Sequence, residues 1–381
     1  MNIIPYGRQE ITSTDIESVL STLRSDYLTQ GPAIYEFEKN FAICVGAKYA
    51  VAVNNGTAAL HLAYLGSGIV NGSRVVTTPL TFAATANAAL YCGADVVFCD
   101  IDPKTMLIDI EKLEEILKVE NIDLITIVSF AGYPIEHRKL SEIAKKYGCK
   151  IIEDACHSPG SSRVYENEIV RTGSCDYVDV TVFSFHPVKH IACGEGGMIT
   201  TNCEDVYEKL CLLRTHGISN KELKFKTNND GLWYHEQHEL GYNYRMPDIL
   251  AALGNSQLMR LRSSIQKRNE IAVIYDKHLR DLPLTVPYRE NSIEHAFHLY
   301  VIRTERRKEL YEYLRSNKIF AQVHYLPVYL HPYYREKYGC LKGQFPVVEK
   351  FYDECLSLPM FPTLSSIDQQ YVISKIIEFC N

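Results

Sequence analysis

Residues 179–201 read Asp-Val-Thr-Val-Phe-Ser-Phe-His-Pro-Val-Lys-His-Ile-Ala-Cys-Gly-Glu-Gly-Gly-Met-Ile-Thr-Thr. The apolar run at the start predicts a strand that ends near His186-Pro187, because proline lacks the backbone donor that a strand requires. The glycines that follow permit tight turns, and Met198–Thr201 predicts a second strand. Lys189 is therefore expected on a constrained loop between two strands. It is either a solvated surface cation, which this stretch alone favours, or an amine positioned for Schiff-base chemistry.

Short apolar strands alternate with helices over the first half of the chain. Strands are predicted at Tyr49–Val53, Val75–Thr78, Asp95–Cys99, Asp123–Ser129 and Lys150–Glu153, and helices at Ala33–Val45, Ala58–Leu65, Ala83–Tyr91, Ile110–Leu117 and Leu140–Tyr147. This alternation predicts an α/β fold with a mainly parallel sheet that is covered by helices on both faces. Ligands bind such sheets at the carboxyl ends of the strands. The candidate site residues are therefore those that follow the strands: Asn55–Thr57, Thr81-Phe82, Asp154–His157 and Ser184–Lys189.

Several of these residues have an ordinary structural interpretation as well as a functional one. Asn55-Gly56-Thr57 lies between a strand and a helix N-terminus, where backbone N–H groups bind phosphate, but Asn or Thr there is equally a simple N-cap. Asp154 is either a helix cap or a carboxylate beside the crevice. His157 is either a satisfied polar residue at the sheet edge or a site residue. Phe82 would ordinarily belong to the core.

Composition and charge are those of an ordinary globular protein. The chain has 381 residues, of which 46% are hydrophobic and 23% charged, and its net charge is −6 at pH 7. This charge gives no electrostatic case for binding nucleic acid or an anionic membrane. The 12 cysteines form no C-x-x-C pair, which argues against a zinc ribbon, and no metal site is predicted. The N-terminus does not resemble a secretory signal and no apolar run reaches membrane-spanning length, so we expect a cytoplasmic location with reduced thiols.

The alternating pattern ends after Leu213. Residues 221–238 are polar and predict a long loop, which is followed by two consecutive helices that end near Leu261 and Leu279. Farther on, the sequence predicts strands near His298–Ile302 and Phe320–His324 and helices near Arg307–Ser316 and Gln369–Phe379. The length favours two domains. We predict a large domain over residues 1–260, with an N-terminal arm and helix, and a smaller α+β domain over residues 261–381.

Together the strand-end residues resemble the site of pyridoxal phosphate (PLP) enzymes of fold type I, the aspartate-aminotransferase-like enzymes. More closely, nearly the whole chain resembles the DegT/DnrJ/EryC1/StrS sugar aminotransferases. The matching segments are Asn55-Gly56-Thr57-Ala58-Ala59-Leu60, Thr78-Pro79-Leu80-Thr81-Phe82, Glu153-Asp154-Ala155-Cys156-His157, Ser184-Phe185-His186-Pro187-Val188-Lys189, Gly194-Glu195-Gly196-Gly197 and Gly241-Tyr242-Asn243-Tyr244-Arg245. The resemblance implies a large, mostly parallel sheet domain and a smaller C-terminal α+β domain.

The resemblance also implies a role for each site residue. Lys189 would bind PLP as a Schiff base and move a proton during amino transfer, Asp154 would bind the pyridine nitrogen, and His157 would assist catalysis. Phe82 would stack on the cofactor ring, and Gly56, Thr57 and Ser184 would hold its phosphate. Asn243 would reach the phosphate in the neighbouring subunit, so the active unit would be a homodimer with shared active sites. The positions that would contact a nucleotide sugar are Tyr6, Asp26, Tyr27, Leu28, Thr29, His324 and Tyr325.

Within the family the chain is most similar to enzymes of the pseudaminic acid pathway, through residues 77–90, 183–189 and 321–329. This similarity implies L-glutamate as the amino donor and C4 of a UDP-linked 4-keto-6-deoxy-N-acetyl sugar as the acceptor. Spore-coat sugar aminotransferases are nearly as similar, through Leu330-His331-Pro332-Tyr333-Tyr334. The alternatives are another nucleotide keto-sugar (perosamine, viosamine, spore-coat or 3-keto type) and a PLP-binding regulator without turnover. The family's 3-dehydratases have histidine at the Schiff-base position, so Lys189 argues against that reaction.

Overall fold

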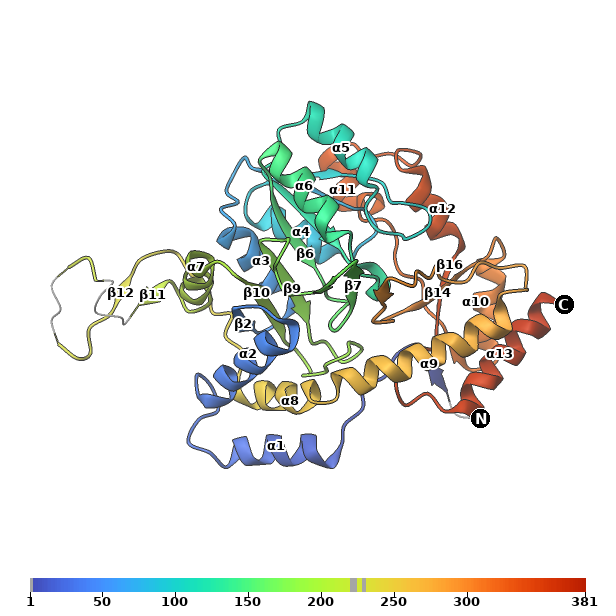
Figure 1. Cartoon of the computed structure of the whole chain (residues 1–381), viewed down its shortest axis with the longest axis horizontal. Coiled ribbons are helices and arrows are strands. Elements are labelled where there is room, and N and C mark those ends of the chain that lie inside the picture. Colours follow the sequence, from blue (N-terminus) through green and yellow to red (C-terminus); the bar gives the residue numbers. More distant parts are fainter. Residues whose placement is uncertain (1–2, 220–224, 228–230) are drawn as a thin grey trace.

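The computed structural model describes residues 3–219, 225–227 and 231–381, and a seven-stranded sheet forms its centre (Figure 1). In spatial order the strands are β2 (Tyr49–Val53), β10 (Gly197–Thr201), β9 (Val180–Ser184), β6 (Lys150–Asp154), β5 (Leu124–Val128), β3 (Arg74–Thr77) and β4 (Asp95–Phe98). Neighbouring strands from β9 to β4 pair in parallel, whereas β10 is antiparallel to both β2 and β9. The predicted mainly parallel sheet is confirmed.

Helices cover both faces of this sheet, and strand β9 shows why. Its side chains alternate between the faces: Val180 and Val182 pack into one hydrophobic cluster, and Phe183 packs into another. On the second face, the Phe183 ring lies 4.9 Å from that of Phe41. The helices that follow the first strands are α3 (Gly56–Gly66), α4 (Ala83–Tyr91), α5 (Ile110–Val119), α6 (His137–Tyr147) and α7 (Glu204–Arg214), and Phe41 belongs to α2 (Pro32–Val45). The predicted helices of the first half are all present, α4 with the predicted ends.

The loop that carries Lys189 connects two strands that are hydrogen-bonded side by side. Gly197 at the start of β10 pairs with Ser184 at the end of β9, so the loop returns to the sheet edge that it left. A Cβ atom on Gly197 would lie 2.6 Å from the carbonyl oxygen of Asn55. Glycine is therefore required for this close approach of three chain segments.

A third hydrophobic cluster forms around the C-terminal part of the chain. It contains Tyr275, Tyr300, Leu314 and Leu358, and it also includes Ile4 from the N-terminus. Its elements are β1 (Ile4–Pro5), α9 (Leu261–Leu279), β14 (Tyr300–Arg303), α10 (Arg307–Ser316), β15 (Ile319–Phe320), β16 (Cys355–Leu358) and α13 (Ser366–Cys380). Strand β1 pairs with β15, so the N-terminal arm packs on the C-terminal part, and both termini lie at the same end of the molecule (Figure 1). The division of the chain at residue 260 remains a prediction.

Helix α9 follows α8 (Asp248–Leu258) with a break of two residues, and α8 packs between α2 and α1 (Ser13–Leu23). Buried Asp15 of α1 ties these segments together, because its carboxylate pairs with Arg260 at 2.6 Å and accepts from Ser256 at 2.7 Å. The remaining elements of the C-terminal part are η3 (Val328–Leu330), α11 (Pro332–Tyr338) and α12 (Pro346–Glu354).

Three parts of the fold differ from the sequence predictions. The strand expected over Phe320–His324 is only the two-residue β15, because the chain then leaves the sheet and carries His324 and Tyr325 into the cavity described below. A small sheet of β13 (Ile293–Glu294), β7 (Ser162–Tyr165) and β8 (Glu168–Arg171) was not predicted. The predicted loop over residues 221–238 lies partly outside the described residues, and in the described part β11 (Ile218–Ser219) pairs with β12 (Glu236–Gln237).

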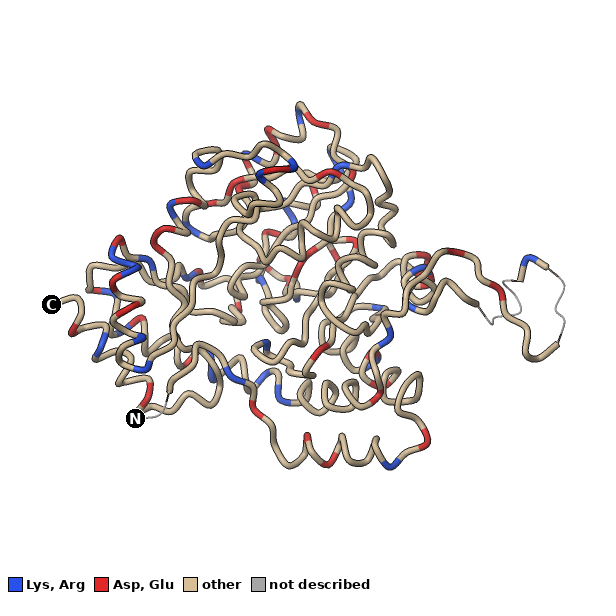
Figure 2. The backbone as a smooth tube through the Cα atoms, turned by 180° about the vertical axis from the view of Figure 1, so that it is seen from behind, with Lys and Arg blue, Asp and Glu red and all other residues tan. Residues whose placement is uncertain are grey.

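Acidic and basic residues are interspersed over the whole fold (Figure 2), and the segment that carries β11 and β12 projects away from the body (Figure 1). Within the described residues, no helix combines the length and the apolar character that a bilayer crossing requires.

Candidate active site

One cavity of about 440 Å³ lies beside the carboxyl ends of β2, β6 and β9, and we call it the cofactor cavity. Ten of the predicted site residues line it: Tyr6, Gly56, Thr57, Phe82, Asp154, His157, Ser184, Lys189, His324 and Tyr325. The prediction that the strand-end residues gather at one edge of the sheet is therefore confirmed. The chemical roles assigned to them remain predictions.

Lys189 reaches the cofactor cavity from the loop between β9 and β10. Its backbone N–H donates to the carbonyl of His186 at 2.8 Å, which closes a tight turn in this loop. Burial lowers the pKa of the Lys189 amine, and the nearby Cys156 and Asp154 groups oppose this effect. The amine is therefore closer to its neutral form than a surface lysine would be, and the interpretation of Lys189 as a solvated surface cation is wrong.

Asp154 is the last residue of β6, and its carboxylate is held from two sides. One oxygen accepts a hydrogen bond from the Thr85 hydroxyl at 2.7 Å, and the other accepts from the Cys156 backbone N–H at 3.2 Å. Since a hydroxyl has one proton and Thr85 gives it to Asp154, the Thr81 hydroxyl must donate to Thr85, at 2.7 Å. The next element after β6 is strand β7, so the alternative that Asp154 caps a helix is wrong.

His157 is buried, and its two ring nitrogens have different partners. The backbone N–H of Ala131 donates to Nδ1 at 3.3 Å, and Nε2 lies 3.2 Å from the Tyr325 hydroxyl. Burial first, and then the positive charge of Lys189, hold the pKa of His157 well below its usual range. The neutral ring must therefore carry its proton on Nε2 and donate it to Tyr325.

The N-terminus of helix α3 forms another part of the cavity wall. The Asn55 side chain accepts from the Ala58 N–H at 2.8 Å and so is the N-cap, which leaves the N–H groups of Gly56 and Thr57 outside the helical hydrogen bonds. A Cβ atom on Gly56 would lie 2.9 Å from Cβ of Ser184, so glycine allows the helix to start against this serine. The N-cap interpretation is confirmed for Asn55, and phosphate binding by the residues after it, which line the cavity, remains a prediction.

These features fit PLP. The cavity contains an amine, a carboxylate held by Thr85, and a group of hydrogen-bond donors at Gly56, Thr57 and Ser184 beside a helix N-terminus. PLP requires these three kinds of group, for its aldehyde, its pyridine nitrogen and its phosphate respectively.

Aromatic side chains form the mouth of the cofactor cavity. Phe82 precedes α4, is 63% exposed and lies 6.2 Å from the Tyr325 ring, so its interpretation as a core residue is wrong. The Tyr6 ring lies 5.3 Å from that of His324. His324 is fixed by its Nδ1 contact to the Ser357 hydroxyl at 2.8 Å, and burial lowers its pKa to about 4.

Five predicted residues do not line the cofactor cavity within one chain. Asn243 is exposed, and its backbone pairs with that of Thr215. The other four are Asp26, Tyr27, Leu28 and Thr29, which are exposed in the connection between α1 and α2. They are not brought together with Lys189 by the fold of a single chain.

The cavity also includes residues to which the sequence analysis assigned no role. Thr85 binds Asp154, and Phe130 and Cys156 line the wall. Thr85 could have been found, because it lies four residues after Thr81 at the start of a predicted helix, so the two share one face. Phe130 gave no such signal, since it follows β5 in a short 3₁₀ turn, η1 (Phe130–Gly132), that the pattern does not reveal.

The comparisons with known proteins agree with this geometry. The model of the DegT/DnrJ/EryC1/StrS aminotransferase family matches residues 9–377. A UDP-4-amino-4,6-dideoxy-N-acetyl-beta-L-altrosamine transaminase of Campylobacter jejuni is 38% identical over 97% of this chain and 96% of its own. The spore coat polysaccharide biosynthesis protein SpsC of Bacillus subtilis is 38% identical over 98% of this chain and 96% of its own. Among solved structures, Helicobacter pylori PseC, an aminotransferase of pseudaminic acid biosynthesis, superposes with a TM-score of 0.89 at 30% identity and covers 100% of this chain and 99% of its own.

Proposed function

The chain belongs to the DegT/DnrJ/EryC1/StrS aminotransferase family, whose enzymes act with PLP, and on this premise we propose that it moves the amino group of L-glutamate to C4 of a UDP-linked 4-keto-6-deoxy-N-acetyl hexose. The observation that carries the chemistry is the convergence of Lys189, Asp154 and the start of α3 in one cavity. The choice of sugar is supported by the Campylobacter transaminase and the Helicobacter enzyme, which act in this kind of amination.

Each residue of the cofactor cavity would have its own role in amino transfer. When bound, PLP supplies the electron sink that permits an amino group to leave one molecule and join another. Lys189 Nζ would anchor it covalently, and the lowered pKa of this amine suits it to take and return a proton. The Asp154 carboxylate, oriented by Thr85, would bind the pyridine nitrogen.

The phosphate and the ring would be held by separate parts of the wall. The Gly56 and Thr57 N–H groups and the Ser184 hydroxyl would bind the phosphate at the positive end of α3. Phe82 would cover the ring face. His157 would fix the Tyr325 hydroxyl through the Nε2 proton, which leaves the Tyr325 proton free to donate into the cavity.

The complete active site would require two chains. Asn243 and residues 26–29 lie outside the cavity of their own chain, and Phe82 at its mouth is largely exposed. Helix α1 also leaves Ile16, Leu20 and Leu23 between 42% and 52% exposed, at helical spacing. These exposed apolar residues support a homodimer in which Asn243 reaches the partner's phosphate site and residues 26–29 take part in binding the sugar nucleotide. The cytoplasmic location remains a prediction from the sequence.

The proposal is tested in two half-reactions. With purified holoenzyme, L-glutamate should remove the visible absorbance of the bound cofactor, and a panel of UDP- and dTDP-linked 4-keto sugars should then restore it, the UDP-linked N-acetyl 4-keto sugar most rapidly. If glutamate removed the absorbance and that sugar did not restore it, the assignment as an aminotransferase would stand and the proposed sugar substrate would be wrong. Faster restoration by a different sugar would favour the spore-coat type of acceptor, which the 38% identity to SpsC supports. No response to glutamate by a PLP-loaded chain would favour the regulator.

A further inference from the structure

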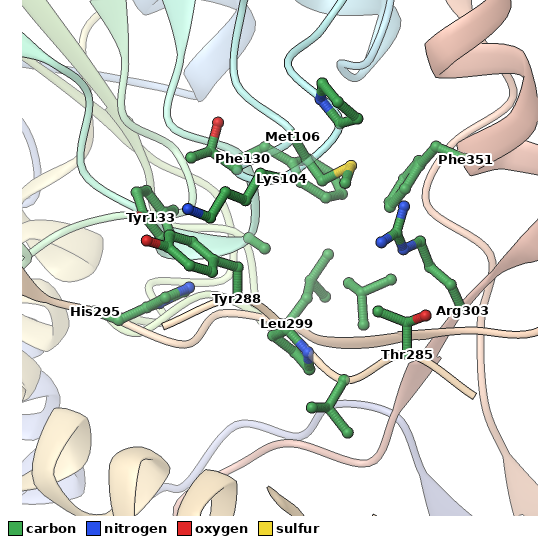
Figure 3. Close-up of a pocket in the computed structure, with 16 residues that line it drawn as sticks. Lys104, Met106, Phe130, Tyr133, Thr285, Tyr288, His295, Leu299, Arg303 and Phe351 are labelled. Carbon is green, nitrogen blue, oxygen red and sulfur yellow. The ribbon is translucent and has the colours of Figure 1, made fainter. Parts of the chain in front are cut away.

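A second cavity, of about 350 Å³ (Figure 3), adjoins the cofactor cavity at Phe130, which lines both. We call it the accessory cavity. It forms where the segment after β4 and the turn η1 meet the strand β14 and the segments before it. The residues that line it are Pro103, Lys104, Thr105, Met106, Phe130, Ala131, Tyr133, Thr285, Val286, Pro287, Tyr288, His295, Leu299, Val301, Arg303 and Phe351.

The charged residues of this lining are all basic. Lys104 and Arg303 line the cavity, and no acidic residue of the described part of the chain does. Two carboxylates outside the lining contact it, and both have partners of their own. Asp102 accepts from the backbone N–H and the hydroxyl of Thr105, at 2.7 and 2.8 Å, and Glu290 accepts from the Tyr133 hydroxyl at 2.9 Å and pairs with Arg163 at 3.0 Å. Burial lowers the pKa of His295 to about 3, so this histidine is neutral. An anion is therefore the ligand that the cavity favours.

The two cations also have little else to bind. Lys104 is exposed at the rim, and its Nζ lies 4.2 Å from the centre of the Tyr288 ring, a contact that positions the amine without neutralising it. The side chain of Arg303 is half-buried and forms no hydrogen bond or ion pair with any residue in the described part of the chain, although its backbone pairs with Thr285. The Arg303 guanidinium is therefore free to bind a ligand carboxylate through charge-assisted hydrogen bonds.

The arrangement of the cations suggests the shape of the ligand. The Lys104 amine lies beside Tyr133 and Tyr288 on one side of the cavity, and the Arg303 guanidinium lies beside Phe351 on the other (Figure 3). The apolar Met106 and Leu299 lie between them. A molecule with an acidic group at each end and an apolar middle matches this order of groups. The cavity volume limits it to a small molecule.

The backbone around the accessory cavity is strained, as ligand sites often are. Met106 and Ala131 have φ angles of 63° and 57°, in the left-handed region that residues with a side chain seldom adopt. Ala131 belongs to the same turn as Phe130, and its N–H donates to His157 in the cofactor cavity. The turn therefore contacts both cavities.

Phe130 is the wall that the two cavities share. It is 2% exposed, and its ring lies 5.7 Å from Phe351 on the accessory side and 6.5 Å from Tyr325 on the cofactor side. In a close-packed interior, a ligand that shifts one face of this ring shifts its contacts on the other face.

We propose that the accessory cavity is a second ligand site, which binds a small organic dianion between Lys104 and Arg303 and whose occupancy changes the cofactor cavity through the Phe130–Ala131 turn. This site does not depend on which sugar the enzyme aminates. It differs from the cofactor cavity in its lining, with Phe130 as the one residue common to both.

The binding half is tested by calorimetry on the holoenzyme with the aliphatic dicarboxylates from succinate to suberate. We expect one dicarboxylate of the series to bind at one site per chain, and adipamide, which is neutral, not to bind. Arg303→Met and Lys104→Met should each weaken binding by about tenfold or more, because each removes one charge-assisted contact. Lys118→Met and Arg262→Met remove exposed cations elsewhere and should leave binding unchanged.

Shorter dicarboxylates resemble glutamate and could enter the cofactor cavity, so the four variants decide the location. Binding that is equally strong in all of them would place the dianion elsewhere and overturn the site, as would no binding by any member of the series. Arg303→Met and Lys104→Met should keep wild-type turnover without the dianion, which shows that they fold. The proposed coupling between the two cavities is tested with the visible absorbance spectrum of the bound cofactor. The spectrum should shift when the dianion is added to wild type and should not shift in Arg303→Met. Binding without a spectral shift in wild type would overturn the coupling.

Discussion

The two cavities on either side of Phe130 are built from different kinds of sequence. In the cofactor cavity, the carboxylate comes from the last residue of one strand and the lysine amine from the loop after the neighbouring strand of the same sheet. In the accessory cavity, two cations come from segments about 200 residues apart, and among the described residues no acidic side chain joins them in the lining. The first set can be anticipated because the ends of parallel strands must meet. The second depends on how the C-terminal part packs against the sheet, which no local pattern specifies.

The largest expected effect is a difference in turnover between variants of Lys189, in the cofactor cavity, and of Lys104, in the accessory cavity. Lys189→Ala should lower turnover by at least about 10³-fold and abolish the visible absorbance of the cofactor, because the amine that binds it and moves its proton is lost. Lys104→Ala should change turnover by no more than about twofold. Steady-state kinetics and absorbance spectra check both, and circular dichroism checks the fold. A PLP adduct that borohydride can still reduce in Lys189→Ala would show that another lysine is the anchor.

Most of the fold and of the cofactor cavity could be predicted before the structure was known. The positions of the segments at Gly56, Asp154 and Lys189 could be predicted because each lies next to a strongly apolar strand, whereas their roles came from the family resemblance. The accessory cavity and Phe130 could not be predicted, since the turn η1 has neither clear periodicity nor a characteristic turn pattern. The position of Asn243 relative to Lys189 depends on a second chain, and the folding of one chain does not determine it.

The second expected effect compares one buried histidine from each cavity. His157 and His295 each accept a backbone N–H at Nδ1, and burial lowers the pKa of both, that of His295 to about 3. Their unfolded pKa is near 6.5, so the unfolded chain binds a proton below that pH while the folded chain does not, and stability falls as the pH falls. His295 should contribute a loss of about 2 kcal/mol between pH 7 and pH 5, and His157 should contribute a loss in the same direction.

Urea unfolding at several pH values measures this effect. In His157→Asn and His295→Asn the free energy of unfolding should depend less steeply on pH than in wild type. His278→Asn is the control, because His278 is exposed and its removal should leave the slope unchanged. If His157→Asn kept the wild-type slope while His295→Asn did not, the His157 ring would be protonated in the folded enzyme, and its proposed role as a neutral donor to Tyr325 would be wrong.

A smaller effect is expected from two threonines that make the same contact in different cavities. Thr85 donates to Asp154 at 2.7 Å, and Thr105 donates to Asp102 at 2.8 Å. Thr85→Val should lower turnover by about tenfold, because the carboxylate that would bind the pyridine nitrogen loses its orienting hydrogen bond. Thr105→Val should leave turnover unchanged. Equal turnover in the two variants would mean that the orientation of Asp154 does not limit the reaction.

The smallest expected signal tests whether the two cavities differ in needing a second chain. The accessory cavity is lined by one chain, whereas the proposed cofactor site takes Asn243 from the partner. Asn243→Ala and Lys189→Ala should then each be inactive as homodimers. In a mixed dimer, one site would contain both substitutions and the other neither. Random pairing makes half of the dimers mixed, so co-refolding equal amounts should restore about a quarter of the wild-type sites.

One quarter of the wild-type activity is the maximum recovery. The recovered activity must be compared with that of a pair of variants that cannot complement each other. Lys189→Ala refolded with Asp154→Ala is that control, because both residues lie in the cofactor cavity of the same chain and every mixed dimer keeps one substitution in each site. Subunit exchange is verified by mass spectrometry with one isotope-labelled partner. If exchange occurred and the Asn243→Ala pair recovered no more activity than the control, Asn243 would act within its own chain or outside the site. The residues of the cofactor cavity, like those of the accessory cavity, would then all come from one chain.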